Sequence, residues 1–198
     1  MTYKNKQGIK AIFFDMDGTI TRPHIDWKAL RDRVGVPPGV PIMAHLEALP
    51  EPEKTRAETV LCDVEYEAAE SAEPNPGVAE LFDYLSRQPL DLALITNNHR
   101  RAMHRVVEKL GLPFQLLLSR EDALLKPAPD LLLLALSRLH LAPTDAVFVG
   151  DGHYDRAASA AAGIPYIHLA HDLTTEPNGP TIHHLRELPD HLSPDISG

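Results

Sequence analysis

The sequence predicts an α/β protein, a three-layer fold in which a parallel sheet is covered by helices on both faces. Two observations carry this prediction. Short apolar runs alternate along the chain with segments whose apolar residues recur at helical spacing. Each run ends abruptly in polar residues, as is typical of strands buried on both faces of a parallel sheet. In such folds ligands bind beyond the carboxyl ends of the strands, so the polar residues there are candidate site residues.

The first predicted strand, residues 11–14, leads directly into two acids, Asp15 and Asp17. Positions i and i+2 of an extended chain share a face, so both carboxylates can reach one small volume. Acids this close repel each other unless a metal ion or a shared proton lies between them. Asp-Gly is also a common turn dipeptide, and for this pair alone a turn and a site remain equally open. An EF-hand calcium loop is a third interpretation, but its further acidic positions and closing Glu are missing.

The segment that follows the first strand is rich in Glu, Ala, Leu and Pro and shows no strand pattern. Helices are expected over three ranges, 26–34, 42–49 and 53–71. Their apolar spacing favours packed helices over a flexible linker. We therefore predict a small all-helical cap formed by residues 21–75 and a core formed by residues 1–20 and 76–198.

The remainder of the chain alternates helices and strands after a turn at Asn75-Pro76-Gly77. Further strands are expected over residues 90–95, 114–118, 146–149 and 166–169. Further helices are expected over residues 78–86, 100–110, 129–139 and 155–162. The tail beyond His171 is expected to be mostly irregular, with a weak helix near residues 182–188. This alternation is what predicts the parallel sheet.

Polar residues at the ends of later strands should meet the two acids at one edge of the sheet. Thr96 and Asn97 follow the second predicted strand, and Asp151 follows the fourth. Each candidate has an ordinary explanation when taken alone: Thr96 could cap the next helix, Lys126 could be a solvated lysine, and Asp151 and Asp155 could form a turn and a helix cap. Their joint position at matching strand ends favours a site.

Four separated pieces occur in order along the chain: Asp15-Met16-Asp17-Gly18-Thr19, Ile95-Thr96-Asn97, Lys126-Pro127 and Gly150-Asp151-Gly152-His153-Tyr154-Asp155. Together they resemble the haloacid dehalogenase-type hydrolase superfamily over about residues 8–170, with its Rossmann-like core. The predicted insert resembles the small helical cap of phosphoglycolate phosphatase-like members. Many relatives carry an acid shortly after the first motif, where this chain has Arg22; Arg22 or His24 could contact substrate or simply be solvated.

The resemblance implies a phosphatase that acts on a small phosphorylated metabolite, of the phosphoglycolate or sugar-phosphate kind. Asp15 would be the nucleophile that forms an aspartyl-phosphate. Asp17 would protonate the leaving alcohol and then deprotonate the attacking water. Thr96 would bind a phosphate oxygen, helped by backbone N–H groups near Asn97, and Lys126 would be a cation beside Asp15 and the phosphate.

The resemblance also implies a Mg²⁺ cofactor, because Mg²⁺ prefers a few carboxylates together with water and substrate oxygens. Its protein ligands would be Asp15, the backbone carbonyl of Asp17, and Asp151. Asp155 would bind the metal directly or through water.

Three other functions compete with the phosphatase. A phosphomutase of the β-phosphoglucomutase kind shares the first steps, but so small a cap gives less of the enclosure that it needs. A dehalogenase lacks the second acid, so Asp17 argues against it. A non-catalytic binding role conflicts with the complete set of site residues. Residues between Arg22 and Cys62 are expected to decide which substrate is accepted.

The composition argues against nucleic acid and membranes as partners. The chain has 198 residues, a net charge of −9 and one cysteine, and no run of Lys and Arg points to nucleic acid. No stretch of apolar residues approaches the length of a membrane span, so we expect a cytoplasmic protein. We expect it to be a monomer or a homodimer. Acidic neighbours should raise the pKa of Cys62 and leave it unreactive. Four histidines are expected at the surface without a metal, namely His168, His171, His183 and His184.

Overall fold

The structure, a computed structural model, describes residues 8–23, 25–172 and 179–192. His24, one of the possible substrate contacts, lies outside these residues. Among the described residues, no helix combines the length and the apolar character that crossing a membrane requires.

The core is one parallel sheet of six strands in the order β3-β2-β1-β4-β5-β6, which confirms the predicted fold class. The strands are β1 (Ala11–Phe14), β2 (Asp91–Ile95), β3 (Leu116–Leu118), β4 (Ala146–Gly150), β5 (Tyr166–Leu169) and β6 (Thr181–Ile182). β1 is fully buried and pairs with β2 on one side and β4 on the other. Phe14 stands in register with Leu94 and Val149, so the residues that follow these three strands emerge side by side at one edge.

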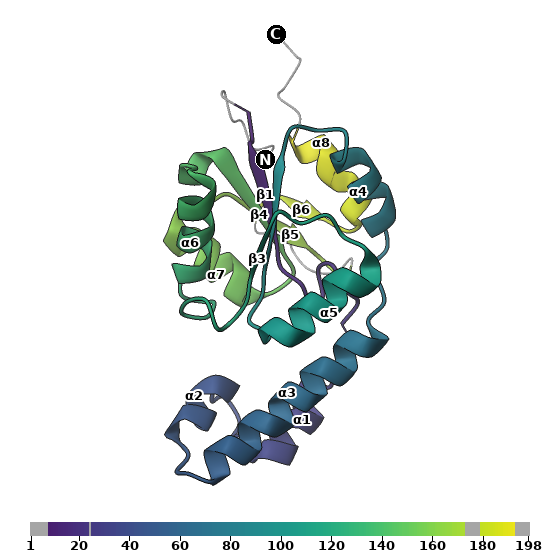
Figure 1. Cartoon of the computed structure of the whole chain (residues 1–198). Helices are drawn as coiled ribbons and strands as arrows, with labels where there is room; N and C mark the ends of the chain where they lie inside the picture. The colour runs from purple at the N-terminus through teal and green to yellow at the C-terminus, as the bar shows by residue number, and fades with distance from the viewer. Residues whose placement is uncertain (1–7, 24, 173–178, 193–198) are drawn as a thin grey trace.

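Helices cover both faces of this sheet (Figure 1). One face carries α4 (Val78–Leu85), α5 (Arg100–Leu110) and α8 (Leu188–Leu192), and the other carries α6 (Asp130–Leu139) and α7 (His153–Ala162). The side chains of β1 alternate between the two resulting apolar cores, with Ile12 and Phe14 in one and Ala11 and Phe13 in the other. This alternation explains why the strand contains no polar residue.

Three helices lie beyond the carboxyl edge of the sheet: α1 (Trp27–Val34), α2 (Ile42–Ala48) and α3 (Glu53–Ser71) (Figure 1). They share a small apolar cluster that includes Leu30, Leu46 and Leu61. We call these residues, 27–71, the helical insert. The division of the chain into a cap of residues 21–75 and a core stays a prediction.

The tail differs from the sequence prediction. Thr181 and Ile182 form β6, a sixth parallel strand beside β5, and helical backbone begins only at Leu185, later than the weak helix predicted near 182–188. A 3-10 turn, η2 (Leu185–Glu187), follows instead and leads into α8. A strand of two residues is too short to show a period in the sequence, but Ile182 is completely buried and closes the sheet edge.

Candidate active site

The turn after β1 brings its acids to the centre of the carboxyl edge. The backbone N–H of Asp15 still bonds to the carbonyl of Val149 at 2.9 Å, so this side chain stands directly at the end of the ladder. Gly18 then adopts a φ of +85°, and a β-carbon there would collide with the carboxylate of Asp151. Glycine is therefore required both by the turn and by the approach of the acid from β4.

Asn75 fixes this turn from the returning chain. Its amide nitrogen lies 2.7 Å from the carbonyl oxygen of Gly18, 2.9 Å from that of Thr19 and 3.0 Å from that of Thr21. The side chain is buried, so the contacts are shielded from water. The sequence suggested only a turn at Asn75, whereas its side chain holds the turn that carries Asp17.

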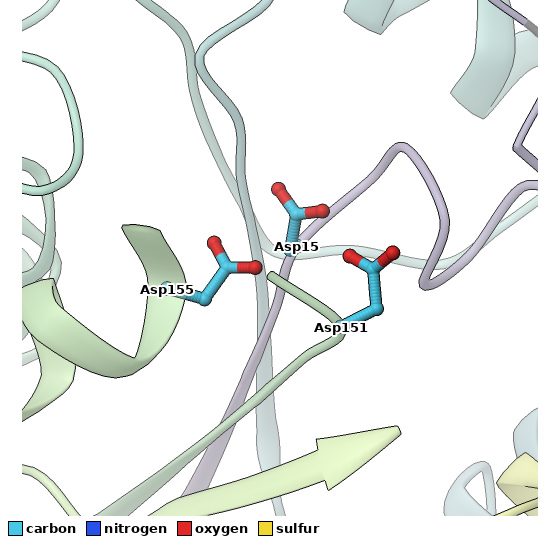
Figure 2. Close-up of side chains that lie close together, drawn as sticks. All are labelled: Asp15, Asp151 and Asp155. Atoms are coloured by element: carbon cyan, nitrogen blue, oxygen red, sulfur yellow. The ribbon is translucent and has the colours of Figure 1, made fainter. Parts of the chain in front are cut away.

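Three carboxylates meet at the edge, from Asp15, Asp151 and Asp155 (Figure 2). Each offers an oxygen that lies within 4.8 Å of the others. Asp155 comes from the first turn of α7 and approaches Gly150 so closely that a β-carbon there would lie 2.7 Å from its own. Oxygen ligands of this kind and number suit a divalent cation, so these residues fit the expected metal.

Lys126 lies buried between two of these acids. Its Nζ is 2.5 Å from Asp15 Oδ1, 2.6 Å from Asp155 Oδ1 and 3.0 Å from the carbonyl oxygen of Ile95. Burial by itself would lower the pKa of Lys126, but the charges of Asp15 and Asp155 outweigh burial and raise it, so the ammonium stays protonated. The interpretation of Lys126 as a solvated lysine is therefore wrong.

Burial and the neighbouring Asp155 raise the pKa of Asp15 well above its usual value, while the charge of Lys126 opposes the rise. A cation bound by the carboxylates would oppose it too, because opposite charge favours the ionised form. The arrangement thus favours a bound positive ion when Asp15 is ionised.

The carboxylate of Asp17 is not among the three that could share a metal. Its Oδ2 accepts a hydrogen bond of 2.8 Å from the amide of Asn98. Burial raises the pKa of Asp17 to about 6, although the bond from Asn98 opposes the rise. A carboxyl group with this pKa can both give and take a proton near neutral pH.

Thr96 and Asn97 stand between these groups, at the end of β2. The hydroxyl of Thr96 accepts a bond of 3.0 Å from the backbone N–H of Asn98, so its own hydrogen can be donated elsewhere. It does not cap α5; that cap is His99, whose Nδ1 accepts from Ala102. The side-chain oxygen of Asn97 accepts a hydrogen bond of 2.9 Å from the backbone N–H of Lys126, and its side-chain nitrogen donates one of 2.8 Å to the carbonyl of Lys126. These two bonds orient the side chain of Asn97 toward the backbone of Lys126.

A buried ion pair beside Asp17 was missed by the sequence reasoning. Glu65 of α3 lies 2.6 Å from Arg120, which follows β3, and both side chains are nearly inaccessible. Arg120 also contacts Cys62 Sγ at 3.2 Å. The pKa of Cys62 is raised as predicted, but burial contributes more than the neighbouring acid does. Glu65 is one of many acids along α3, so the sequence held no signal that singled it out.

The histidines are not all surface residues. His171 Nε2 lies 3.2 Å from Asp151 Oδ2, and this hydrogen bond raises the pKa of His171. Of the four histidines expected at the surface, His168 and His183 are half-buried, whereas His171 and His184 are exposed. Arg22, in contrast, is exposed and lies near Glu73, 3.8 Å away. Only folding shows which histidine reaches the acids, since neither its spacing nor its neighbours mark His171.

Comparison with known proteins agrees with this geometry. The family model for haloacid dehalogenase-like hydrolases matches residues 9–163. A haloacid dehalogenase-like hydrolase domain-containing protein of Arabidopsis thaliana is 30% identical over 80% of this chain and 69% of its own length. An uncharacterized hydrolase of Saccharomyces cerevisiae is 30% identical over 96% of this chain and 88% of its own. A phosphoglycolate phosphatase of Salmonella choleraesuis is 31% identical over 79% of this chain and 62% of its own.

Solved structures show the same fold. A subfamily IA hydrolase of the same superfamily from Geobacter sulfurreducens superposes with a TM-score of 0.67 at 23% identity, covering 96% of this chain and 100% of its own. CbbY from Rhodobacter sphaeroides, solved in complex with phosphate, superposes with a TM-score of 0.69 at 22% identity, covering 93% of this chain and 99% of its own. At such identities the likeness concerns the fold alone. The sequence matches, however, cover most of the chain, and the family model includes the acids of the carboxyl edge. The chain belongs to the haloacid dehalogenase-like hydrolase family.

Proposed function

We propose that this hydrolase is a Mg²⁺-dependent phosphatase that acts on a small phosphorylated metabolite, of the phosphoglycolate or sugar-phosphate kind, through an aspartyl-phosphate on Asp15. The observation that carries the proposal is the buried Lys126 held between Asp15 and Asp155, beside a third carboxylate that could share a metal. The Salmonella relative named phosphoglycolate phosphatase supports the substrate class.

In the first step Asp15 would attack phosphorus. Its Oδ1 is engaged by Lys126, which leaves Oδ2 to form the new bond. As the bond from phosphorus to the leaving oxygen breaks, Asp17 would give its proton to that oxygen, and an alcohol departs. Thr96 would donate its hydroxyl hydrogen to a phosphate oxygen, and Lys126 would balance the charge that gathers there.

In the second step a water molecule would attack the phosphorus of the aspartyl-phosphate. Asp17, now ionised, would take the proton of the water, and the bond between phosphorus and Asp15 breaks to release phosphate. When bound, Mg²⁺ would supply positive charge for the phosphoryl oxygens. Asp15, Asp151 and the backbone carbonyl of Asp17 would hold it, with Asp155 binding directly or through water.

The test is release of phosphate from a panel of phosphorylated metabolites, with Mg²⁺ and with EDTA. Asp15→Asn should lower kcat by about 1,000-fold or more, because covalent catalysis needs the charged oxygen. Asp83→Asn is the matched control, since Asp83 lies exposed on α4 and pairs with the exposed Arg87 of the same segment. Equal activity of wild type and Asp15→Asn would contradict the proposal. Conversion of sugar phosphates without release of phosphate would instead favour a phosphomutase.

A further inference from the structure

The proton donor of the proposed reaction is held by a neighbouring amide. Asn98 follows β2 by three residues, its side chain is buried, and its Nδ2 lies 2.8 Å from Asp17 Oδ2. No other hydrogen bond to the Asp17 carboxylate is found among the described side chains. The position of this carboxylate therefore depends on one contact.

Hydrogen bonds hold both the side chain and the backbone of Asn98. Its side-chain oxygen accepts a bond of 3.2 Å from the backbone N–H of His99. Its own backbone N–H donates to Thr96 Oγ1 at 3.0 Å. Because the amide oxygen faces a donor, the amide nitrogen must face the carboxylate, which assigns the direction of the bond to Asp17.

We propose that Asn98 is the positioning residue for the proton transfer, and that it directs the proton of Asp17 to Oδ1. The inference rests on the proposed function, in which Asp17 protonates the leaving oxygen. An oxygen that accepts from an amide N–H is the better acceptor when it carries no proton, so the bond to Oδ2 favours protonation of Oδ1. Oδ1 would then be the oxygen that gives its proton to the leaving group.

Asn98 would also stabilise the transition state. As the bond between Oδ1 and hydrogen breaks, the proton moves to the leaving oxygen, and Asp17 becomes a carboxylate. A hydrogen bond to a charged acceptor is stronger than one to a neutral acceptor, so the contact from Asn98 strengthens as the proton leaves. Interactions that strengthen in the transition state raise kcat more than they change KM.

The proposal predicts an effect that depends on the leaving group. An alkyl alcohol leaves only when it is protonated, whereas p-nitrophenolate leaves as a stable anion and needs little help. A single turnover follows departure of the leaving group apart from the later attack of water, which also needs Asp17. In single turnovers of Asn98→Leu, alcohol release from the best alkyl phosphate of the panel should slow by about 100-fold, against about threefold or less for release of p-nitrophenolate from p-nitrophenyl phosphate. KM should change by about twofold or less, since ground-state binding is untouched.

A remote amide gives the matched control. Gln115 Oε1 accepts from the backbone N–H of Leu92, at the amino end of β2 and so at the opposite edge of the sheet. Gln115→Leu removes an amide and one hydrogen bond and should leave both substrates unaffected. Asn98→Ala repeats the test without a bulky replacement, should Asn98→Leu fail to fold.

A double variant separates positioning from general damage. In the same single turnovers, which end before water attacks, Asp17→Asn should show this selective loss on alkyl phosphates. Adding Asn98→Leu to it should cause no further loss, because the two residues act as one unit. An equal loss on both substrates, no loss, or an additive loss would each overturn the assignment. Failure of wild type to hydrolyse any phosphate ester with Mg²⁺ would instead refute the proposed phosphatase.

Discussion

At the scale of single residues, the decisive feature is a cation buried among acids. Lys126 is only 4% exposed, yet it carries a charge. Removing a charge from water costs several kcal/mol, and here the two carboxylates offset that cost. The charge of Lys126 also offsets the repulsion between Asp15 and Asp155. Lys126 therefore serves the stability of the fold as well as the site.

Lys126→Met should lower the free energy of unfolding by about 3–5 kcal/mol at pH 7, because two buried carboxylates lose the positive charge that pairs with them. Urea unfolding measures the change. Lys10→Met is the matched control: Lys10 pairs with Asp145 at 3.2 Å with its side chain 58% exposed, and surface pairs of this kind are worth about 1 kcal/mol or less. Equal losses in the two variants would show that the burial of Lys126 carries no special cost.

At the scale of elements, α3 is a helix of the helical insert that contacts the rest of the protein. Glu65 pairs with Arg120 at its middle, and Glu70 receives two bonds from Arg105 of α5, at 2.6 and 3.2 Å. Figure 1 shows α3 running from the insert to the side of α5. The buried pair sits where the insert meets the core, so its protonation bears on how firmly the two are joined.

Glu65 should make stability fall as the pH rises. Burial raises the pKa of Glu65 from 4.5 to about 7, although Arg120 opposes the rise. The folded protein therefore holds this proton more tightly than the unfolded chain does. The stabilisation that comes from the raised pKa of Glu65 is fully present below about pH 4.5 and is lost as the pH rises past 7. Each unit of difference in pKa corresponds to about 1.4 kcal/mol, so the free energy of unfolding should fall by about 3 kcal/mol over this range.

The measurement is the free energy of unfolding between pH 5 and about 8, in wild type and in Glu65→Gln. The variant cannot titrate, but its amide oxygen still accepts from Arg120, so its stability should vary less with pH. Glu70→Gln on the same helix replaces an acid that is exposed, and it should leave the wild-type slope unchanged. A slope that Glu65→Gln does not alter would place the titration elsewhere.

At the scale of the whole molecule, the fold concentrates negative charge at one edge. The net charge is −9, and three carboxylates, two of them directly after β1 and β4 and the third in α7, meet within a few ångströms. Like charges at this distance destabilise the folded state, since the unfolded chain separates them. A divalent cation that binds only the folded chain would remove that repulsion and stabilise the protein by mass action.

Mg²⁺ should therefore raise the melting temperature, and EDTA should reverse the rise. At 100 times the dissociation constant the gain is about 2.7 kcal/mol. Asp151→Asn should melt at or above the temperature of the metal-free wild type, because one repelling charge is gone, while losing most of the response to Mg²⁺. Differential scanning calorimetry at constant ionic strength separates the two effects. An unchanged Mg²⁺ response in Asp151→Asn would exclude this carboxylate as a ligand.

Local patterns determined most of the secondary structure. The helix over 100–110 and the strand over 166–169 lie where the sequence predicted them. The spacing of apolar residues and the signals that end an element depend only on residues close together in the sequence. Helix α7 begins at His153, two residues before its predicted start, because the polar residues after β4 give no apolar signal there. β6 was missed, since two residues carry no period.

By itself the sequence determined the parallel sheet, the helical insert, and the placing of Asp15, Thr96 and Asp151 at one edge, since strand ends are local features and parallel strands share an edge. Only the tertiary structure decided which side chains meet there. Lys126 enters between two acids, and Asn98 reaches Asp17 across 81 positions. Such contacts depend on packing between segments that are distant in the sequence. No periodic pattern in the sequence indicates them.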